Sequence, residues 1–161
     1  MSEVKKSRMR PRLGQLMSQA GGGMYVAEAL KRADATLEIL REPSLVGIDD
    51  YIAALEALLV ADGDDVTRSE RLYARASDIV SLCGAERNEA VQVAARSLCD
   101  LLDESEGLPP SVQAGVKVHI ASIKLLHRAD SDPSMHDIIL QGLASVLEKQ
   151  RGEAAEKTPA A

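Results

Sequence analysis

Aliphatic residues recur every three or four positions from about residue 24 to residue 150, and almost nowhere at every second position. Side chains at that spacing lie on one face of an α-helix, whereas strict alternation is typical of a half-buried strand. Short segments rich in Gly, Pro and Asp interrupt the pattern, as turns do. The sequence therefore predicts an all-α fold, an antiparallel bundle of about five to six helices with flexible termini.

Six helical segments are expected, at about residues 24–41, 44–61, 67–83, 86–103, 110–127 and 133–149. Pro43 is expected to end the first segment, because a proline interrupts a helix, and to open the second. Thr67 and Glu70 fit a capping box at the start of the third segment. The aliphatic residues of the first segment form one stripe; they are Val26, Leu30, Ala33, Leu37 and Leu40.

The length of 161 residues fits one domain, and the domain is expected to span residues 24–150. Phe and Trp are absent, so the core is expected to consist of Leu, Ile, Val, Ala and Met. Residues 1–23 end in three consecutive glycines and are interpreted as a flexible basic arm. Residues 151–161 are rich in Gly, Ala, Glu, Lys and Pro and are interpreted as a disordered tail.

The charge is distributed unevenly along the chain. Residues 1–12 carry five basic side chains against Glu3, a net charge of +4, and the basic residues are Lys5, Lys6, Arg8, Arg10 and Arg12. Because the whole chain carries −6, the remaining residues carry −10. An acidic body repels phosphate, so nucleic acid is not expected as a partner. The basic arm is either a solubilising extension or a candidate partner-binding segment.

The two cysteines, Cys83 and Cys99, fall at helical positions and form no CxxC motif. They are interpreted as reduced residues in or near the core of a cytoplasmic protein. No stretch of the sequence has the roughly 20 apolar residues needed to span a bilayer, so no membrane span is expected.

His119 is the one residue that suggests phosphoryl chemistry. It lies on the apolar stripe of the fifth segment, between Val116 and Ile123, as a phosphoacceptor histidine does on a bundle helix. Histidine phosphotransfer domains carry a lysine about three positions after the histidine, where this chain has Ser122 and carries Lys124 later. His119 is therefore either a phosphoacceptor or a core histidine whose ring nitrogen meets a carbonyl or an acid.

The other histidines give no metal motif. His119 and His127 are eight residues apart, which is too long for two zinc ligands on one helix, and His136 lies in a first helical turn. The chain has no nucleophile elbow and no phosphate-binding loop. We therefore expect no metal, no cofactor and no enzymatic activity other than phosphotransfer through His119.

Protein binding remains the function that the sequence favours. Acidic helical bundles bind partners through a groove between helices or through a charged helix face. Tyr25, Tyr51 and Tyr73 lie in the first three segments and are candidate anchors at an interface. The alternative for each tyrosine is a ring that packs on the core with its hydroxyl in water.

Three strings of residues resemble a known family. They are 22–30 (GGMYVAEAL), 40–45 (LREPSL) and 94–102 (AARSLCDLL). In these strings the chain resembles CheE, small helical proteins encoded beside chemotaxis genes in alphaproteobacteria. The resemblance covers most of residues 22–147 and implies an accessory protein that binds a histidine kinase or a response regulator. It implies no active-site residue.

The resulting hypothesis is a non-enzymatic, cytoplasmic accessory protein of bacterial chemotaxis or two-component signalling that binds a protein partner through a helical surface. One alternative is a histidine phosphotransfer protein that uses His119. The other is a structural protein whose aliphatic stripe makes a homodimer.

Overall fold

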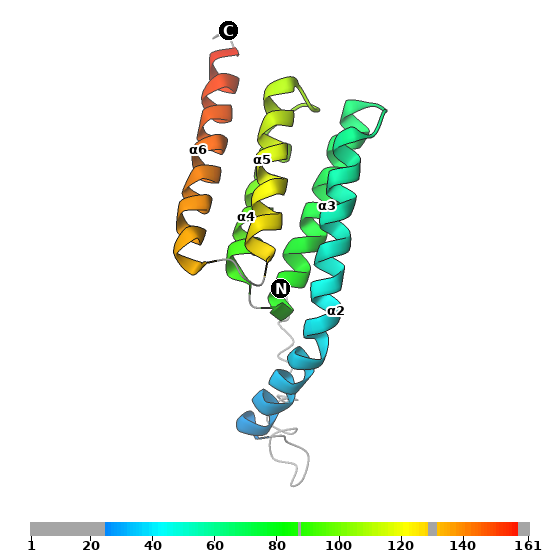
Figure 1. Cartoon of the computed structure of the whole chain (residues 1–161), viewed down its shortest axis with the longest axis vertical. Helices are drawn as coiled ribbons and strands as arrows, with labels where there is room; N and C mark the ends of the chain where they lie inside the picture. Colours follow the sequence, from blue (N-terminus) through cyan, green and yellow to red (C-terminus); the bar gives the residue numbers. More distant parts are fainter. Residues whose placement is uncertain (1–24, 87, 129–131, 158–161) are drawn as a thin grey trace, which may run out of the picture. The chain divides into compact units, whose positions relative to one another are not determined.

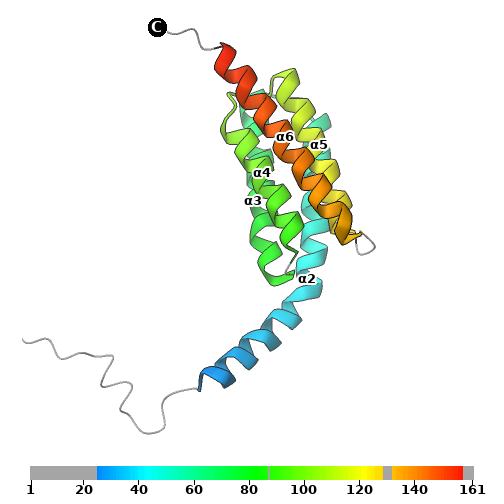
Figure 2. The same cartoon turned by 90° about the vertical axis from the view of Figure 1, so that its left-hand side faces the viewer.

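A computed structural model describes residues 25–86, 88–128 and 132–157. Within these ranges the chain forms five α-helices and no strand, which confirms the all-α prediction. The chain divides into two units, Met1–Thr36 and Leu37–Ala161. In the second unit the helices lie side by side as a bundle (Figures 1 and 2). The five helices are α2 (Val26–Val60), α3 (Asp65–Glu86), α4 (Glu89–Asp103), α5 (Pro110–His127) and α6 (Pro133–Lys157).

Helix α2 continues through Pro43, so the helix end predicted there was wrong and the first two expected segments are one helix of 35 residues. Proline in a helix interior removes one hydrogen bond and crowds the carbonyl four residues earlier. That carbonyl belongs to Ile39, which is exposed and leaves room for water. Ile48, Ile52 and Leu55 are buried on the following turns, and this burial holds α2 on the bundle.

Helix α6 extends to Lys157, so the tail predicted to be disordered from residue 151 onwards is helical as far as the structure describes it. Its last turns contain Ala, Glu and Lys, which are strong helix formers. Arg151 also forms ion pairs with Glu104, the residue directly after α4, at 2.6 Å, and with Glu148 one turn earlier, at 3.0 Å. Composition alone does not show that Arg151 has Glu104 as a partner outside its own helix. The predicted arm, residues 1–23, lies outside the described residues.

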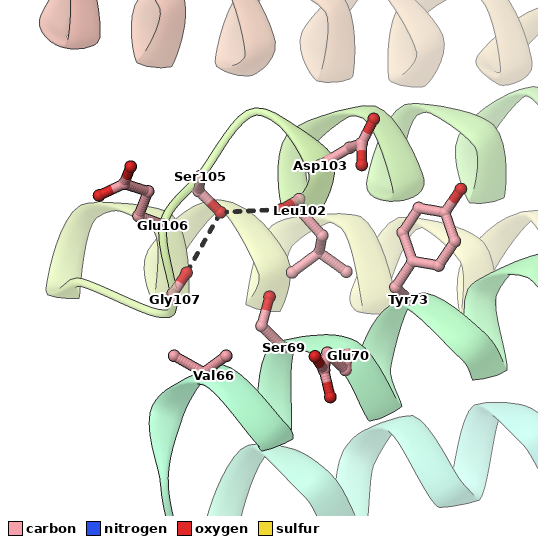
Figure 3. Close-up of a pocket in the computed structure, with 9 residues that line it drawn as sticks. All are labelled: Val66, Ser69, Glu70, Tyr73, Leu102, Asp103, Ser105, Glu106 and Gly107. Carbon is pink, nitrogen blue, oxygen red and sulfur yellow. Dashed lines mark hydrogen bonds between the residues drawn. The ribbon is translucent and has the colours of Figure 1, made fainter.

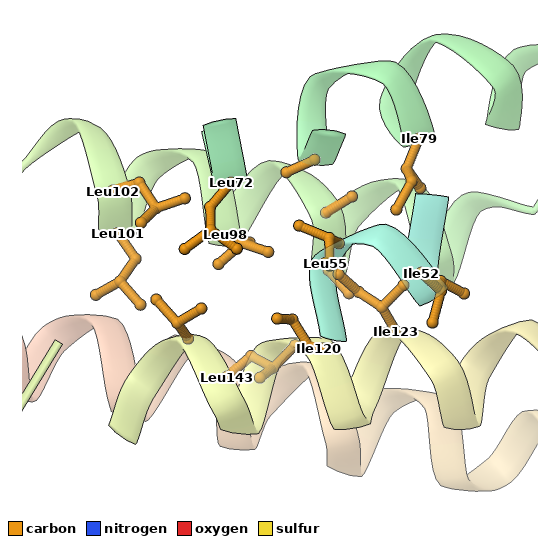
Figure 4. Close-up of a cluster of buried hydrophobic side chains, with 14 of the residues drawn as sticks. Ile52, Leu55, Leu72, Ile79, Leu98, Leu101, Leu102, Ile120, Ile123 and Leu143 are labelled. Atoms are coloured by element: carbon orange, nitrogen blue, oxygen red, sulfur yellow. The ribbon is translucent and has the colours of Figure 1, made fainter. Parts of the chain in front are cut away.

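Helix α4 contacts α3, α5 and α6 and lies at the centre of the bundle. Six of its residues are buried, at the spacing that lets one short helix face several neighbours. The interior is aliphatic, as the composition predicted (Figure 4). The labelled core residues in that view are Ile52, Leu55, Leu72, Ile79, Leu98, Leu101, Leu102, Ile120, Ile123 and Leu143.

Contacts between α5 and α6 define their relative direction. The Gln150 side chain, late in α6, donates to the carbonyl of Ser111, early in α5, at 3.2 Å. The two helices are consecutive in the chain, so this contact makes them antiparallel. For the bundle as a whole, the antiparallel order of neighbours stays a prediction. Gly115 allows α5 to approach α4 closely, since a Cβ there would lie 3.0 Å from Leu101 Cδ2.

Helix α3 begins earlier than the capping-box pattern predicted. Asp64, not Thr67, caps it: the Asp64 carboxylate accepts from the Thr67 backbone N–H at 2.9 Å and from the Thr67 hydroxyl at 3.0 Å. These hydrogen bonds hold the pKa of Asp64 below its usual value. Aspartate directly before a helix is as good a cap as threonine, so two candidates three positions apart fit the same role.

The aliphatic stripe of the first segment is exposed for most of its length within the described chain. Every residue from Tyr25 to Thr36 is exposed, and Leu40 is exposed as well. The same stripe is buried further along α2, at Ser44, Ile48 and Ile52. Spacing identifies a stripe that favours burial, but it does not say whether the same chain supplies the covering surface.

Candidate functional site

His119 lies on α5 with no exposed surface. Its Nδ1 lies 2.8 Å from the Gly115 carbonyl oxygen, and its Nε2 lies 2.9 Å from Ser97 Oγ on α4. A carbonyl only accepts, so Nδ1 carries the proton and Nε2 accepts from the Ser97 hydroxyl. Burial lowers the pKa of His119, although the bond to Gly115 opposes this. The ring is therefore a neutral, fully hydrogen-bonded core histidine.

The sequence left two alternatives for His119, and this geometry matches the second: a core histidine whose ring nitrogen meets a carbonyl. A phosphoacceptor needs a ring nitrogen that a phosphoryl donor can reach. In His119 both nitrogens are occupied inside the protein and the side chain is sealed. The arrangement gives no support to phosphotransfer through this residue.

The remaining predicted site residues are not gathered at one place. The basic arm residues lie outside the part of the chain that the structure describes; they are Lys5, Lys6, Arg8, Arg10 and Arg12. His127 lies at the end of α5, where its Nε2 is 3.3 Å from Asp49 on α2. In the described ranges, no three His, Cys, Asp or Glu side chains converge as metal ligands would.

Cys83 is buried and Cys99 is half-buried, and both are reduced. Burial, with the charges of Asp100 and Asp103, raises the pKa of Cys99 to about 11. A thiol with that pKa is protonated at neutral pH and is a poor nucleophile. Cys99 is therefore a poor candidate for covalent chemistry.

The three tyrosines lie in different surroundings. Tyr25 is almost fully exposed, while the Tyr51 ring is half-buried beneath the Arg75 guanidinium, 5.4 Å from the ring centre. Tyr73 is 42% exposed and lines a groove between α3 and the segment that follows α4. Of the candidate anchors, Tyr73 is the one that a groove surrounds.

This groove, here called the acidic groove, has a volume of about 740 Å³. Side chains of α3 form one wall and the end of α4 with its following loop forms the other (Figure 3). Its apolar lining residues are Val66 and Tyr73, which are partly exposed, and Leu102, which is buried. Its full lining is Val66, Ser69, Glu70, Tyr73, Leu102, Asp103, Ser105, Glu106 and Gly107.

The loop wall of the acidic groove is held in place by hydrogen bonds. The Ser105 hydroxyl lies 3.1 Å from the Leu102 carbonyl and 3.2 Å from the Gly107 carbonyl (Figure 3). Gly107 has φ +80°, a backbone conformation that residues other than glycine rarely adopt. Leu108 is buried, and its carbonyl accepts from Gln113 at 3.0 Å. The wall is thus part of the folded bundle.

Electrostatically, the acidic groove is one-sided. Glu70, Asp103 and Glu106 line it, and no Lys, Arg or His does. Within the described part of the chain, none of these three carboxylates forms an ion pair with a basic side chain. The adjacent Glu104 differs, because hydrogen bonds from Arg151 hold its pKa below its usual value. The groove therefore combines an exposed apolar surface with uncompensated negative charge.

Sequence reasoning identified Tyr73 but not the groove. The sequence places Glu70 in the capping-box pattern of one predicted helix and Asp103 at the end of the next. Glu70 lies on α3, more than thirty positions before Asp103 on α4 and Glu106 in the following loop, so no local pattern joins the three acids. The excess of acid in residues 13–161 was the only available signal.

Comparisons with known proteins assign no family: no family model matches the chain, and neither a curated protein nor a solved structure matches it. None of the described helices combines the length and apolar character that a bilayer span requires.

Proposed function

We propose that this protein is a non-enzymatic interaction protein that binds a protein partner through the acidic groove. The observation that carries the proposal is the combination of Tyr73, Val66 and Leu102 with three carboxylates that have no cationic partner in the described chain. Apolar contact gives affinity, and charge selects the partner and speeds association.

The partner that fits such a groove presents Lys or Arg beside an apolar side chain. An apolar anchor would cover the Tyr73 ring and Leu102, and basic side chains would pair with Glu70 on one wall and Asp103 or Glu106 on the other. The loop wall is already fixed by Ser105 and Gly107, so partner binding should cost the groove little conformational entropy.

The proposal places the protein in bacterial signal transduction, where the resemblance to CheE implies a histidine kinase or a response regulator as the partner. A cytoplasmic location belongs to the same proposal. The predicted role of the basic arm changes: an acidic groove attracts a basic partner, so the arm would serve a different, acidic surface.

The direct test is affinity capture on the full-length chain, followed by measurement of binding to the captured signalling protein in purified form. The triple variant Glu70→Gln, Asp103→Asn, Glu106→Gln should weaken binding by tenfold or more, on the order of 1.4 kcal/mol. The loss should shrink at high salt, because screening already weakens the wild-type attraction.

A matched control removes the same charge elsewhere. Glu42, Asp50 and Asp137 are exposed carboxylates away from the groove lining, and their triple amide variant should bind like the wild type. Equal losses in both triple variants would mean that net charge, not the groove, attracts the partner. If no histidine kinase or response regulator is captured, the proposed role in signalling is wrong. If the groove variant binds the partner as well as the wild type does, the acidic groove is not the binding site.

Phosphotransfer is tested separately with a response regulator loaded from acetyl phosphate. We expect no label on this protein, since His119 is sealed. Label that appears on the wild type and disappears in His119→Gln would restore the phosphotransfer alternative.

A further inference from the structure

A second groove lies between the loop that follows α4 and the last turns of α6. Its volume is about 510 Å³. Helix α4 contacts both α3 and α6, so the end of α4 and its loop lie between these two helices (Figure 3). We call this cavity the second groove, and its lining includes Leu101, Glu106, Pro109, Val112, Arg151 and Glu153.

The second groove is continuous with the acidic groove, because Ser105 and Glu106 line both. The last turn of α4 also contributes to each, Leu101 to the second groove and Leu102 to the acidic groove. The loop between them is fixed, since the Ser105 hydroxyl bonds to two backbone carbonyls. A segment bound in the acidic groove therefore reaches the second groove by crossing one ordered loop.

The lining of the second groove fits a long cationic side chain. Its apolar part is the exposed ring of Pro109 together with the buried side chains of Leu101 and Val112. Lys and Arg lay their methylene groups along apolar surface of this kind and keep the charged group in a polar environment. The carboxylates of Glu106 and Glu153 line the same groove and would pair with that charged group.

The second groove also carries a net negative charge. Three carboxylates line it, and Arg151 is the only cationic side chain of the described chain that does. Arg151 is already paired with Glu104 at 2.6 Å and with Glu148 at 3.0 Å. Lys149 lies 4.0 Å from Glu153 and is 76% exposed, so it compensates that carboxylate weakly. A cation from a partner therefore meets a favourable charge in this groove.

We propose that the partner binds through a bipartite basic segment, which places a basic and apolar anchor in the acidic groove and a Lys or Arg side chain in the second groove. A few residues join the two anchors across the loop. This inference rests on the proposed function, because the acidic groove supplies the first contact. Two linked contacts raise affinity, since the second forms within the same complex. Spacing between the anchors then selects the partner, in addition to its charge.

The test compares two sets of synthetic peptides that bind the full-length chain, by isothermal titration calorimetry. Spaced peptides carry two Lys-Leu pairs separated by two, four or six Gly and Ser residues, which span roughly 7–20 Å. Clustered peptides have the same composition, with the two pairs adjacent and the Gly and Ser residues at the end. The best spaced peptide should bind about fivefold tighter than its clustered counterpart. Equal affinities at all three lengths would overturn the proposal.

A charge reversal locates the second contact. Glu153 lines the second groove and not the acidic groove, so Glu153→Lys should weaken the spaced peptide about fivefold and leave the clustered peptide nearly unchanged. Asp137→Lys is the matched control, because Asp137 is exposed on the same helix and lines neither groove. It should weaken both peptides alike, by less than about twofold. A Glu153→Lys effect no larger than this control would show that the second groove is not used.

Glu70→Gln distinguishes failure of this inference from failure of the proposed function, because Glu70 lines only the acidic groove. This variant should weaken both sets of peptides. If it does so while spacing gives no advantage, the acidic groove remains the binding site and the bipartite segment is wrong. If it weakens neither set, the proposed function is wrong, and so is the inference that depends on it.

Discussion

At the scale of single residues, His119 shows how burial decides chemistry. Its helical position is compatible with phosphotransfer, and the sequence supplied no means of deciding. Two hydrogen bonds satisfy both ring nitrogens. One is to the backbone carbonyl of Gly115 on the same helix, and the other is to the Ser97 hydroxyl on another helix. A buried polar group with both partners made is a structural element, and removal of either partner leaves a costly unpaired atom.

The lowered pKa of His119 predicts a pH dependence of stability. The folded state favours the neutral ring, so below the usual pKa of 6.5 the unfolded chain binds the proton first. Stability from this residue is full above that pH and falls as the pH drops towards the folded-state pKa, by at most about 1.4 kcal/mol per pH unit. Urea unfolding between about pH 7.5 and pH 5.5 measures it.

Two variants distinguish the effect of His119 titration on stability from the effect of its buried hydrogen bond. His119→Gln should be less stable throughout but should lose this component of the pH slope. Ser97→Ala should cost roughly 1 kcal/mol, the typical value of one buried hydrogen bond, and keep the slope. Equal slopes in wild type and His119→Gln would contradict the assignment.

At the scale of elements, α2 is where tertiary packing overrode local preference. Pro43 disfavours helix on its N-terminal side, yet α2 runs from Val26 to Val60. Buried Ser44, Ile48 and Ile52 fix the helix after the proline, and only one backbone hydrogen bond is lost at it. A Pro that breaks an isolated helix is tolerated in one that has a surface to pack on.

Replacement of Pro43 by Ala should therefore stabilise the protein. The variant regains a backbone donor and loses the clash with the Ile39 carbonyl, for a gain of about 1–3 kcal/mol in the free energy of unfolding. Chemical denaturation followed by circular dichroism measures the gain. Glu42→Ala, an exposed neighbour, is the control and should change stability by less than about 0.5 kcal/mol. No gain in Pro43→Ala would contradict a continuous α2.

At the scale of the whole molecule, stability rests on an aliphatic interior arranged around α4. Leu98 is fully buried within it, while Val93 on the same helix is 43% exposed. The ion pair between Lys124 and Glu56, at 2.6 Å, joins two helices and is half exposed. Exposed ion pairs of this kind contribute little to the free energy of unfolding. The acidic groove borders this interior, because Leu102 lines the groove and also belongs to the core cluster.

Truncation of Leu98 to Ala should lower the free energy of unfolding by roughly 2–5 kcal/mol, because it removes buried methyl groups and leaves a cavity. Val93→Ala should change it by about 0.5 kcal/mol or less. Urea denaturation of the two variants makes the comparison within one helix. Similar losses at both positions would mean that α4 is not oriented as described.

The sequence by itself determined the helical class, the aliphatic core and the approximate positions of α3, α4, α5 and the start of α6, because helix formation and its period depend on neighbours within a few residues. It did not determine whether the stripe from Val26 to Leu40 is covered, whether α2 passes Pro43 or what surrounds His119. Nor did it show that Glu70, Asp103 and Glu106 share a groove. Each of these depends on side chains brought together across helices, and only the tertiary structure decides those contacts.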